Sequence, residues 1–166
     1  MVKALVVDGY NIIHKIPHLK SMIDKGDLLN ARTKITHLAE EYARKRGGIA
    51  KCIVVFDGRD AYRNSGFTLP KNQLFSKTGK GDEEIINTVK RLSKDYKVEV
   101  VTSDNFVINN SRVYKAGIIS VGEFMRFTGK ENTKQCSQDT LPEKSILKIN
   151  KELIKEWGLG DGYFSV

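Results

Sequence analysis

The stretch Ala4-Leu5-Val6-Val7-Asp8-Gly9-Tyr10-Asn11 decides the fold. Its apolar run, from Ala4 to Val7, is typical of a buried strand, and the following Asp8-Gly9 is typical of a turn that ends a strand. In an open α/β sheet, ligands bind beyond the carboxyl ends of the strands. The sequence therefore predicts that the Asp8 carboxylate lies at the edge where a ligand would bind.

Strand and helix patterns alternate along the rest of the chain. Strands are predicted over 3–7, 51–56, 73–76, 97–102 and 118–120, and helices over 27–46, 82–92, 105–115 and 121–127. No helix is expected between Gly9 and Asp27, where His14 and His18 flank a turn that contains Pro17. The alternation is typical of a doubly wound, mainly parallel sheet flanked by helices, so we expect an α/β fold.

The length of 166 residues fits one domain with an ordinary core. We expect residues 1–128 to form this domain. Residues 129–166 are expected to form a C-terminal extension, whose helix over 143–157 packs on the same domain. No internal repeat interrupts this organisation.

The composition indicates a globular protein with an affinity for polyanions. The formal net charge is +8 and the isoelectric point is about 9.4, which favours nucleic acid as a partner. A lysine-rich solvated surface explains the same charge equally well. No apolar run approaches the roughly 18 residues of a spanning helix, so no membrane is expected. Cys52 and Cys136 lie in unlike settings and form no disulfide framework, which is consistent with the cytoplasm.

Three carboxylates occupy corresponding places in the predicted fold. Asp8 and Asp104 each follow a strand, and Asp82 begins a helix after a glycine-rich turn. Carboxylates gathered at one edge repel one another, which raises their pKa values unless a cation lies between them. Mg²⁺ prefers such oxygen ligands. Taken singly, each residue is explained better as a turn or helix cap, because these are the commoner uses of aspartate. Taken together, the three predict a metal site.

Further residues are assigned supporting roles around these three acids. Asn11 would orient a water or a phosphate, and Glu83 is a further candidate ligand. Ser103 would support Asp104 by a hydrogen bond. Asp57 would either support the site or only shape its own loop.

Basic and aromatic residues are predicted to surround the acids. An acidic pocket ringed by basic loops suits phosphodiester cleavage, because the ring holds the backbone of the substrate. Tyr10 would stack on an unpaired base, although packing in the core explains this residue equally well. The cations assigned to RNA binding are Arg59, Arg63, Lys77 and Lys80.

Four segments in order resemble the NYN-domain branch of the PIN-like nucleases, and most of all the bacterial YacP-type endoribonucleases. The resemblance covers about Val2 to Phe127 and rests on Val6-Val7-Asp8-Gly9-Tyr10-Asn11-Ile12-Ile13, Val55-Phe56-Asp57-Gly58, Gly81-Asp82-Glu83-Glu84-Ile85 and Val101-Thr102-Ser103-Asp104. It implies a three-layer PIN-like fold and Mg²⁺- or Mn²⁺-dependent cleavage of single-stranded RNA. It also implies a metal-site role for Asp8, Asp82 and Asp104, a supporting role for Asn11, messenger RNA as a substrate and the ribosome as a partner.

Two readings of the function stay open at this point. The first is a metal-dependent endoribonuclease, and the alternative is a catalytically weak PIN-like RNA-binding module. A haloacid-dehalogenase-like phosphatase is excluded, because that chemistry needs a second aspartate where this chain has Tyr10. The sequence leaves the oligomeric state open.

Overall fold

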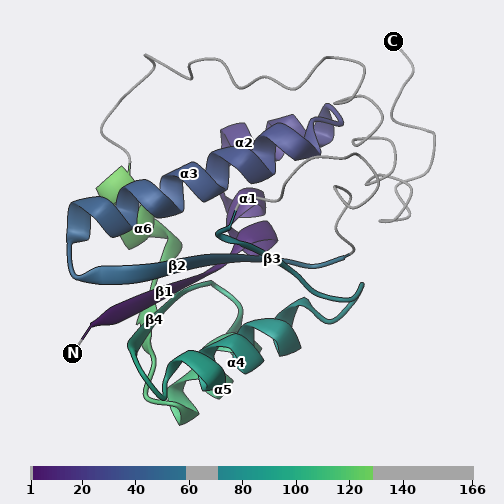
Figure 1. Ribbon diagram of the computed structural model, residues 1–166. Helices are drawn as coiled ribbons and strands as arrows, with labels where there is room; N and C mark the ends of the chain where they lie inside the picture. The colour runs from purple at the N-terminus through teal and green to yellow at the C-terminus, as the bar shows by residue number, and fades with distance from the viewer. Residues whose placement is uncertain (1, 59–70, 129–166) are drawn as a thin grey trace.

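The computed structural model describes residues 2–58 and 71–128, and its centre is a five-stranded parallel sheet (Figure 1). The strands are β1 (Lys3–Asp8), β2 (Ile49–Phe56), β3 (Gln73–Phe75), β4 (Lys97–Val101) and β5 (Gly117–Ile119). They lie in the order β3-β2-β1-β4-β5, and every neighbouring pair is parallel. The predicted α/β class and parallel sheet are confirmed.

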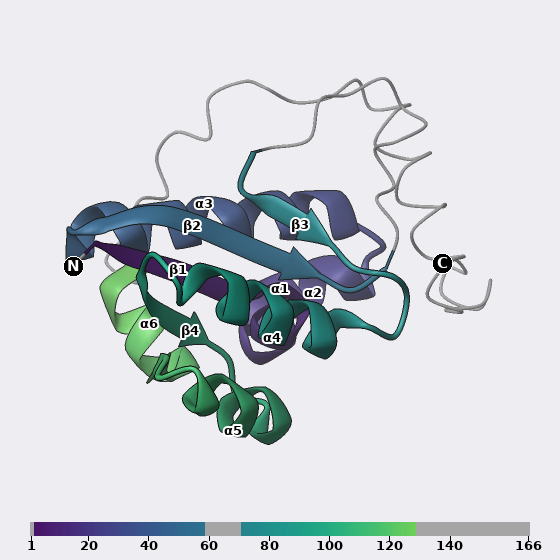
Figure 2. The ribbon, with the colours of Figure 1, turned by 60° about the horizontal axis from the view of Figure 1, so that its bottom comes forward.

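Helices cover both faces of the sheet and give the expected three layers (Figures 1 and 2). One face carries α1 (Gly9–Lys15), α2 (Pro17–Asp24), α3 (Leu28–Arg46) and α6 (Val121–Thr128). The other face carries α4 (Gly81–Leu92) and α5 (Asn105–Val113). The alternating side chains of β1 serve both cores: Leu5 and Val7 belong to the first cluster, and Ala4 and Val6 to the second. A strand buried on both faces reads as a continuous apolar run, which is why 4–7 lacks alternation.

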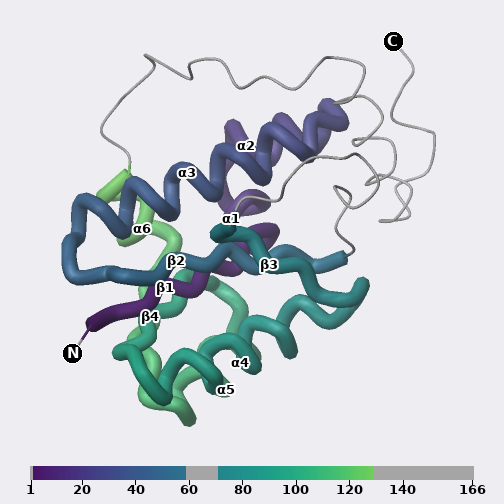
Figure 3. The backbone as a smooth tube through the Cα atoms, in the orientation of Figure 1, coloured from purple at the N-terminus to yellow at the C-terminus, as the bar shows by residue number. Residues whose placement is uncertain are grey.

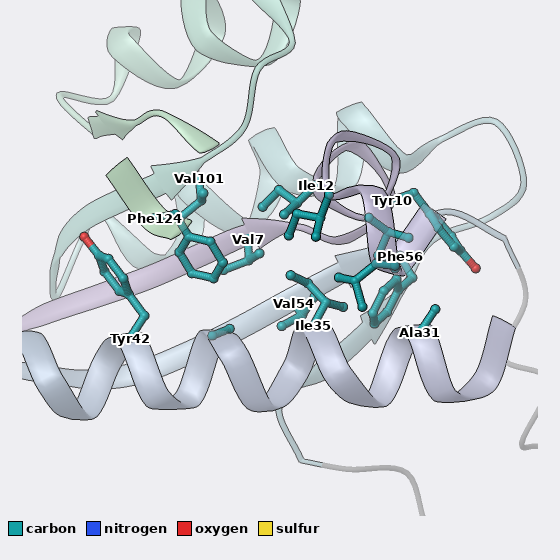
Figure 4. Close-up of a cluster of buried hydrophobic side chains, with 14 of the residues drawn as sticks. Val7, Tyr10, Ile12, Ala31, Ile35, Tyr42, Val54, Phe56, Val101 and Phe124 are labelled. Carbon is teal, nitrogen blue, oxygen red and sulfur yellow. The ribbon is translucent and has the colours of Figure 1, made fainter. Parts of the chain in front are cut away.

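The larger core lies between the sheet and α3 (Figure 4). Val7 and Val54 of the sheet meet Ile35 and Tyr42 of α3, and Phe124 of α6 closes one end of the cluster. The rings of Tyr42 and Phe124 lie 5.2 Å apart. These contacts hold β1 rigidly, so the position of its last residue is set by the core.

The strand order places a topological switch point between β1 and β4. The chain leaves β1 through three helices to reach β2 on one side, and it later crosses from β3 through α4 to β4 on the other side (Figure 3). Connections that leave in opposite directions open a crevice at the carboxyl ends of the two strands. Asp8 ends β1 and Asp104 follows β4 at this crevice.

Helices α1 and α2 were not expected from the sequence. Asp8 ends β1 and also caps α1, because its side chain accepts a hydrogen bond from the Asn11 backbone amide. Pro17 begins α2 at a first-turn position, where its missing N–H removes no hydrogen bond. Asp-Gly and proline were interpreted as turn signals, although both residue types also begin helices.

Some expectations lie outside the described residues. These are the helix over 143–157 with the rest of the C-terminal extension, and the two cations Arg59 and Arg63. Among the residues that the structure describes, no helix has the length and apolar character needed to cross a membrane.

We predict that Gly9→Ala destabilises the protein. A Cβ atom on Gly9 would lie 2.5 Å from Cδ1 of Phe56 and 2.8 Å from the carbonyl oxygen of Val55. Because the second contact is with backbone, overpacking should lower the free energy of unfolding by about 1–3 kcal/mol, measured by urea titration. Gly122→Ala is the matched control, because nothing lies within 4 Å of its added Cβ atom; it should be neutral or raise stability by up to about 1 kcal/mol. Equal stability of the two variants would contradict the prediction.

Candidate active site

Asp8 is a buried carboxylate held at both of its oxygens. It is 8% exposed. Its Oδ1 accepts a hydrogen bond from the backbone amide of Asn11 at 3.3 Å, and its Oδ2 accepts one from Oγ1 of Thr102 at 2.8 Å. Helix α1 and the end of β4 therefore fix the orientation of this side chain.

Burial raises the pKa of Asp8 to about 6. Desolvation is the largest cause, and repulsion from Asp82 and Asp104 raises the pKa further. The hydrogen bonds from Thr102 and Asn11 act in the opposite direction. Asp8 is thus a carboxyl group that changes its charge close to neutral pH.

Thr102 connects Asp8 with Asp104. Its hydroxyl donates to Asp8 and accepts the backbone amide hydrogen of Asp104 at 3.0 Å, and its side chain is 1% exposed. Asp104 itself caps α5, because its Oδ1 accepts from the amides of Phe106 and Val107 at 2.7 and 3.1 Å. Asp104 is therefore both the N-cap of α5 and a neighbour of the other two acids. Sequence analysis missed Thr102, although its position two residues before an aspartate at a strand end is a usable signal.

Ser103 holds Asn11 and makes no hydrogen bond to Asp104. Both its backbone amide and its hydroxyl donate to Oδ1 of Asn11, at 3.1 and 2.7 Å. The expected support of Asp104 by Ser103 is therefore wrong. Consecutive side chains after a strand point in different directions, so Thr102 reaches the acids and Ser103 reaches α1.

A pocket of about 330 Å³ opens between the end of the sheet and the start of α4. Asp8 and Asp82 both line it. Burial is the main cause that raises the pKa of Asp82, and repulsion from Asp104 and Asp57 adds to it. The lining residues are Asp8, Tyr10, Asn11, His14, Val55, Asp57, Gly79, Gly81, Asp82 and Ile85.

Asp57 shapes the turn that brings Asp82 to this pocket. Its carboxylate accepts hydrogen bonds from the Ser76 hydroxyl at 2.9 Å and from the amides of Gly79 and Lys80 at 3.1 and 3.3 Å. The turn packs so closely that a Cβ atom on Gly81 would lie 2.9 Å from Cβ of Asp57. Asp57 therefore supports the site by positioning the start of α4.

The three acids interact electrostatically, but Asp104 does not line the pocket. In residues 2–58 and 71–128, no group of three or more His, Cys, Asp or Glu side chains is placed to hold one metal ion. Asp104 instead accepts the amide hydrogen bonds that cap α5. Asp8 and Asp82 are the two predicted ligands that share the pocket, and the full set of three stays a prediction.

Tyr10 belongs to the core, which contradicts its interpretation as a base-stacking residue. It is 6% exposed, and its ring lies 5.3 Å from that of Phe56 (Figure 4). Its hydroxyl accepts hydrogen bonds from Nε and Nη2 of the fully buried Arg32. The Arg32 guanidinium in turn lies 4.8 Å from the ring centre of Phe75. The ring therefore packs in the core towards α3, although Tyr10 is also one of the residues that line the pocket.

The remaining candidates lie at the rim. Glu83 is absent from the pocket lining, and its carboxylate accepts a hydrogen bond from Nζ of Lys80 at 2.6 Å. Lys77 and Lys80 are exposed in the turn before α4, as a cationic rim requires.

His14 lines the pocket but was not predicted from the sequence. It follows Asn11 by three residues, a spacing that places both side chains on one face of α1. A prediction of helix α1 would have identified His14 by this spacing.

Acidic residues at the switch point of a parallel α/β sheet define an acidic ligand-binding site. The chain belongs to the family of YacP-like NYN domains, whose model matches residues 5–157. This match confirms the resemblance carried by the four segments, and membership supports a nuclease-type function that involves RNA.

Two solved structures are similar to this chain. One is a mutant of Rae1 (YacP) from Bacillus subtilis, with 23% identity, a TM-score of 0.59, and coverage of 98% of this chain and 87% of that chain. The other is Rae1 (YacP) from Bacillus subtilis, with 23% identity, a TM-score of 0.55, and coverage of 95% and 84%. At this identity the likeness establishes the fold. No curated protein matches the chain.

We predict that Asp8→Asn stabilises the protein at alkaline pH. The pKa of Asp8 is about 6 in the folded state, against 3.8 for an ordinary aspartate. Because folding raises the pKa of Asp8, this residue contributes to the stability of the folded state below the unfolded pKa of 3.8. That contribution is lost as the pH rises through about 6. At pH 8 the variant should exceed the wild type by up to about 3 kcal/mol in urea titrations, and the difference should vanish below about pH 4. Asp95→Asn, an exposed control, should stay within about 0.5 kcal/mol at both pH values. A less stable Asp8→Asn variant at pH 8 would refute this.

We further predict that Thr102→Val raises the pKa of Asp8 above about 6, because the hydroxyl that stabilises the ionised form is lost. Thr102→Ser keeps the hydroxyl and should leave the pKa close to the wild-type value. The measurement is a metal-free NMR titration of ¹³C-labelled aspartate carboxyl groups. An unchanged pKa in the valine variant would show that the hydrogen bond has no such effect.

Proposed function

We propose that this protein is a metal-dependent endoribonuclease that hydrolyses phosphodiester bonds in single-stranded RNA. The observation that carries the proposal is the pair formed by buried Asp8 and by Asp82 in one open pocket, at the carboxyl ends of β1 and β2 and beside the switch point of the sheet. Two carboxylates that share a pocket and have raised pKa values form a site that favours a cation. Membership of the YacP-like NYN family supports the nuclease class.

Mg²⁺ or Mn²⁺ is the proposed cofactor. The donor set fits a hard cation, because Asp8, Asp82 and Asn11 offer oxygen atoms and amide groups and no thiolate lies among the pocket residues that the structure describes. Mg²⁺ commonly uses one or two carboxylates and keeps several waters, so Asp8 and Asp82 would suffice as direct ligands with Asp104 nearby. When bound, the ion supplies Lewis-acid stabilisation of charge on the scissile phosphate and lowers the pKa of water.

The protein residues would bind and orient the RNA. Ser103 fixes the carbonyl oxygen of Asn11, which leaves the amide NH₂ group to donate to a phosphate oxygen. Lys77 and Lys80 flank the pocket and would contact the RNA backbone, as Arg59 and Arg63 are also proposed to do. Asp8 must be ionised to hold a cation, so the apparent affinity for the cation should rise as the pH passes through about 6.

We further propose messenger RNA as the substrate, the ribosome as a partner and the cytoplasm as the location. The family resemblance and the net charge of +8 support these assignments. Co-sedimentation with ribosomes in a sucrose gradient tests the partner directly.

A catalytically weak RNA-binding module is the second candidate. It is favoured by the finding that no cluster of three metal-ligating side chains occurs in the described part of the chain. The two candidates differ in one result: the module binds RNA in the presence of either metal without cutting it.

We predict that Asp8→Asn and Asp82→Asn each lower the cleavage rate by at least about 100-fold, because each removes a charge that holds the cation. The assay follows a labelled single-stranded RNA with Mg²⁺ or Mn²⁺ and with EDTA as the metal-free arm. Asp95→Asn is the matched control, since this exposed residue precedes β4 at the opposite end of the sheet. Equal cleavage by all four proteins would refute the proposed function.

A further inference from the structure

The two flanks of the pocket differ in charge and in chemistry. On one side, beyond β2 and β3, the turn before α4 carries the exposed cations Lys77 and Lys80. On the other side, beyond β4, lie Asp104 and the first turn of α5. Strands β3 and β4 are three strand spacings apart, about 14 Å. A ligand that crosses the carboxyl edge of the sheet therefore meets a cationic flank and an anionic flank.

The anionic flank displays one exposed aromatic side chain, Phe106. It is 56% exposed and has no aromatic partner among the described residues. Phe127, the other exposed phenylalanine of the described chain, is engaged: its ring lies 5.4 Å from that of Tyr42 and 5.4 Å from the guanidinium of Arg46. In the described part of the protein, no aromatic ring therefore packs on the exposed side chain of Phe106.

The backbone at Phe106 is fixed on both sides. Its amide donates to Oδ1 of Asp104 at 2.7 Å, and its carbonyl accepts from Nδ2 of Asn110 at 2.8 Å. The backbone that carries the ring is therefore held by hydrogen bonds two residues from Asp104. An aromatic side chain has few rotatable bonds, so it loses little entropy when another flat group stacks on it.

This flank offers little to a phosphate group. The backbone amides of Phe106 and Val107 are used by Asp104, and the amide and hydroxyl of Ser103 are used by Asn11. The charge of Asp104 repels a phosphate at short range. Because these donors are occupied, the exposed Phe106 ring offers a nucleotide on this side a contact with its base.

We propose that Phe106 stacks on a base of the bound RNA, next to the phosphate that a cation at Asp8 and Asp82 would hold. The inference rests on the proposed function for the RNA ligand and for the place of that phosphate. Lysines on one flank would hold phosphates while Phe106 on the other holds a base, which sets the path of the strand across the pocket. Stacking of this kind tolerates any base, because every base has an aromatic face.

Binding of RNA in EDTA tests the proposal without relying on cleavage. The probes are a fluorescein-labelled ten-nucleotide oligo(A) RNA and an abasic ribose-phosphate oligomer of the same length, read by fluorescence anisotropy. Phe106→Ala should weaken binding of oligo(A) by about tenfold or more, and Phe106→Trp should restore it. Val113→Ala is the matched control, since Val113 is 74% exposed on the same helix two turns away; it should bind within about twofold of the wild type.

The abasic oligomer separates base stacking from other causes. Its binding should be the same for the wild type and for Phe106→Ala. The proposal is overturned if Phe106→Ala binds oligo(A) as Val113→Ala does, or if it weakens both probes equally. Because Phe106 is exposed, its removal should leave the thermal unfolding midpoint unchanged, and this is checked by circular dichroism. Cleavage that is lost in Asp8→Asn but unaffected by Phe106→Ala would keep the proposed function and reject this inference alone.

Discussion

The structure of the site depends on the hydrogen bond between Thr102 and Asp8. Asp8 ends a central strand that is packed on both faces, so its buried carboxylate is held where the core meets the pocket. The Thr102 hydroxyl compensates part of the desolvation and at the same time accepts the amide hydrogen of Asp104. One buried side chain therefore ties β1 to the start of α5. The remaining elements of the site are arranged around this pair.

The same arrangement lowers the free energy of unfolding at neutral pH. A carboxylate with a pKa near 6 is ionised at neutral pH only against the cost of burial, and Asp82 and Asp104 add repulsion. A bound cation would relieve both effects, because it supplies the missing positive charge inside the pocket. Strain of this electrostatic kind is typical of functional sites, where groups are held for a ligand rather than for the free protein.

Strands and helices with clear apolar periods were predicted well from the sequence. The five strands and helices α3, α4, α5 and α6 all lie where the pattern placed them, within a few residues at their ends. The misses share a cause. Asp8-Gly9 and Pro17 are compatible either with a turn or with the start of a helix, and tertiary contacts decide between the two structures. Tyr10 and Ser103 were assigned the wrong partners because a short polar or aromatic residue beside a strand end can face either the core or the ligand.

The sequence by itself determined the α/β class, the family and the acids to consider, because these follow from periodicity and from four short segments read in order. Only the tertiary structure decided which acids share a pocket. Asp82 shares the pocket with Asp8 because Asp57 holds the preceding turn, whereas Asp104 caps α5 and does not line the pocket. It also decided that Tyr10 is buried and that, among the described residues, Phe106 is exposed two residues from Asp104. The physical reason is that burial and hydrogen-bond partners depend on contacts between segments far apart in the chain, which local sequence patterns do not encode.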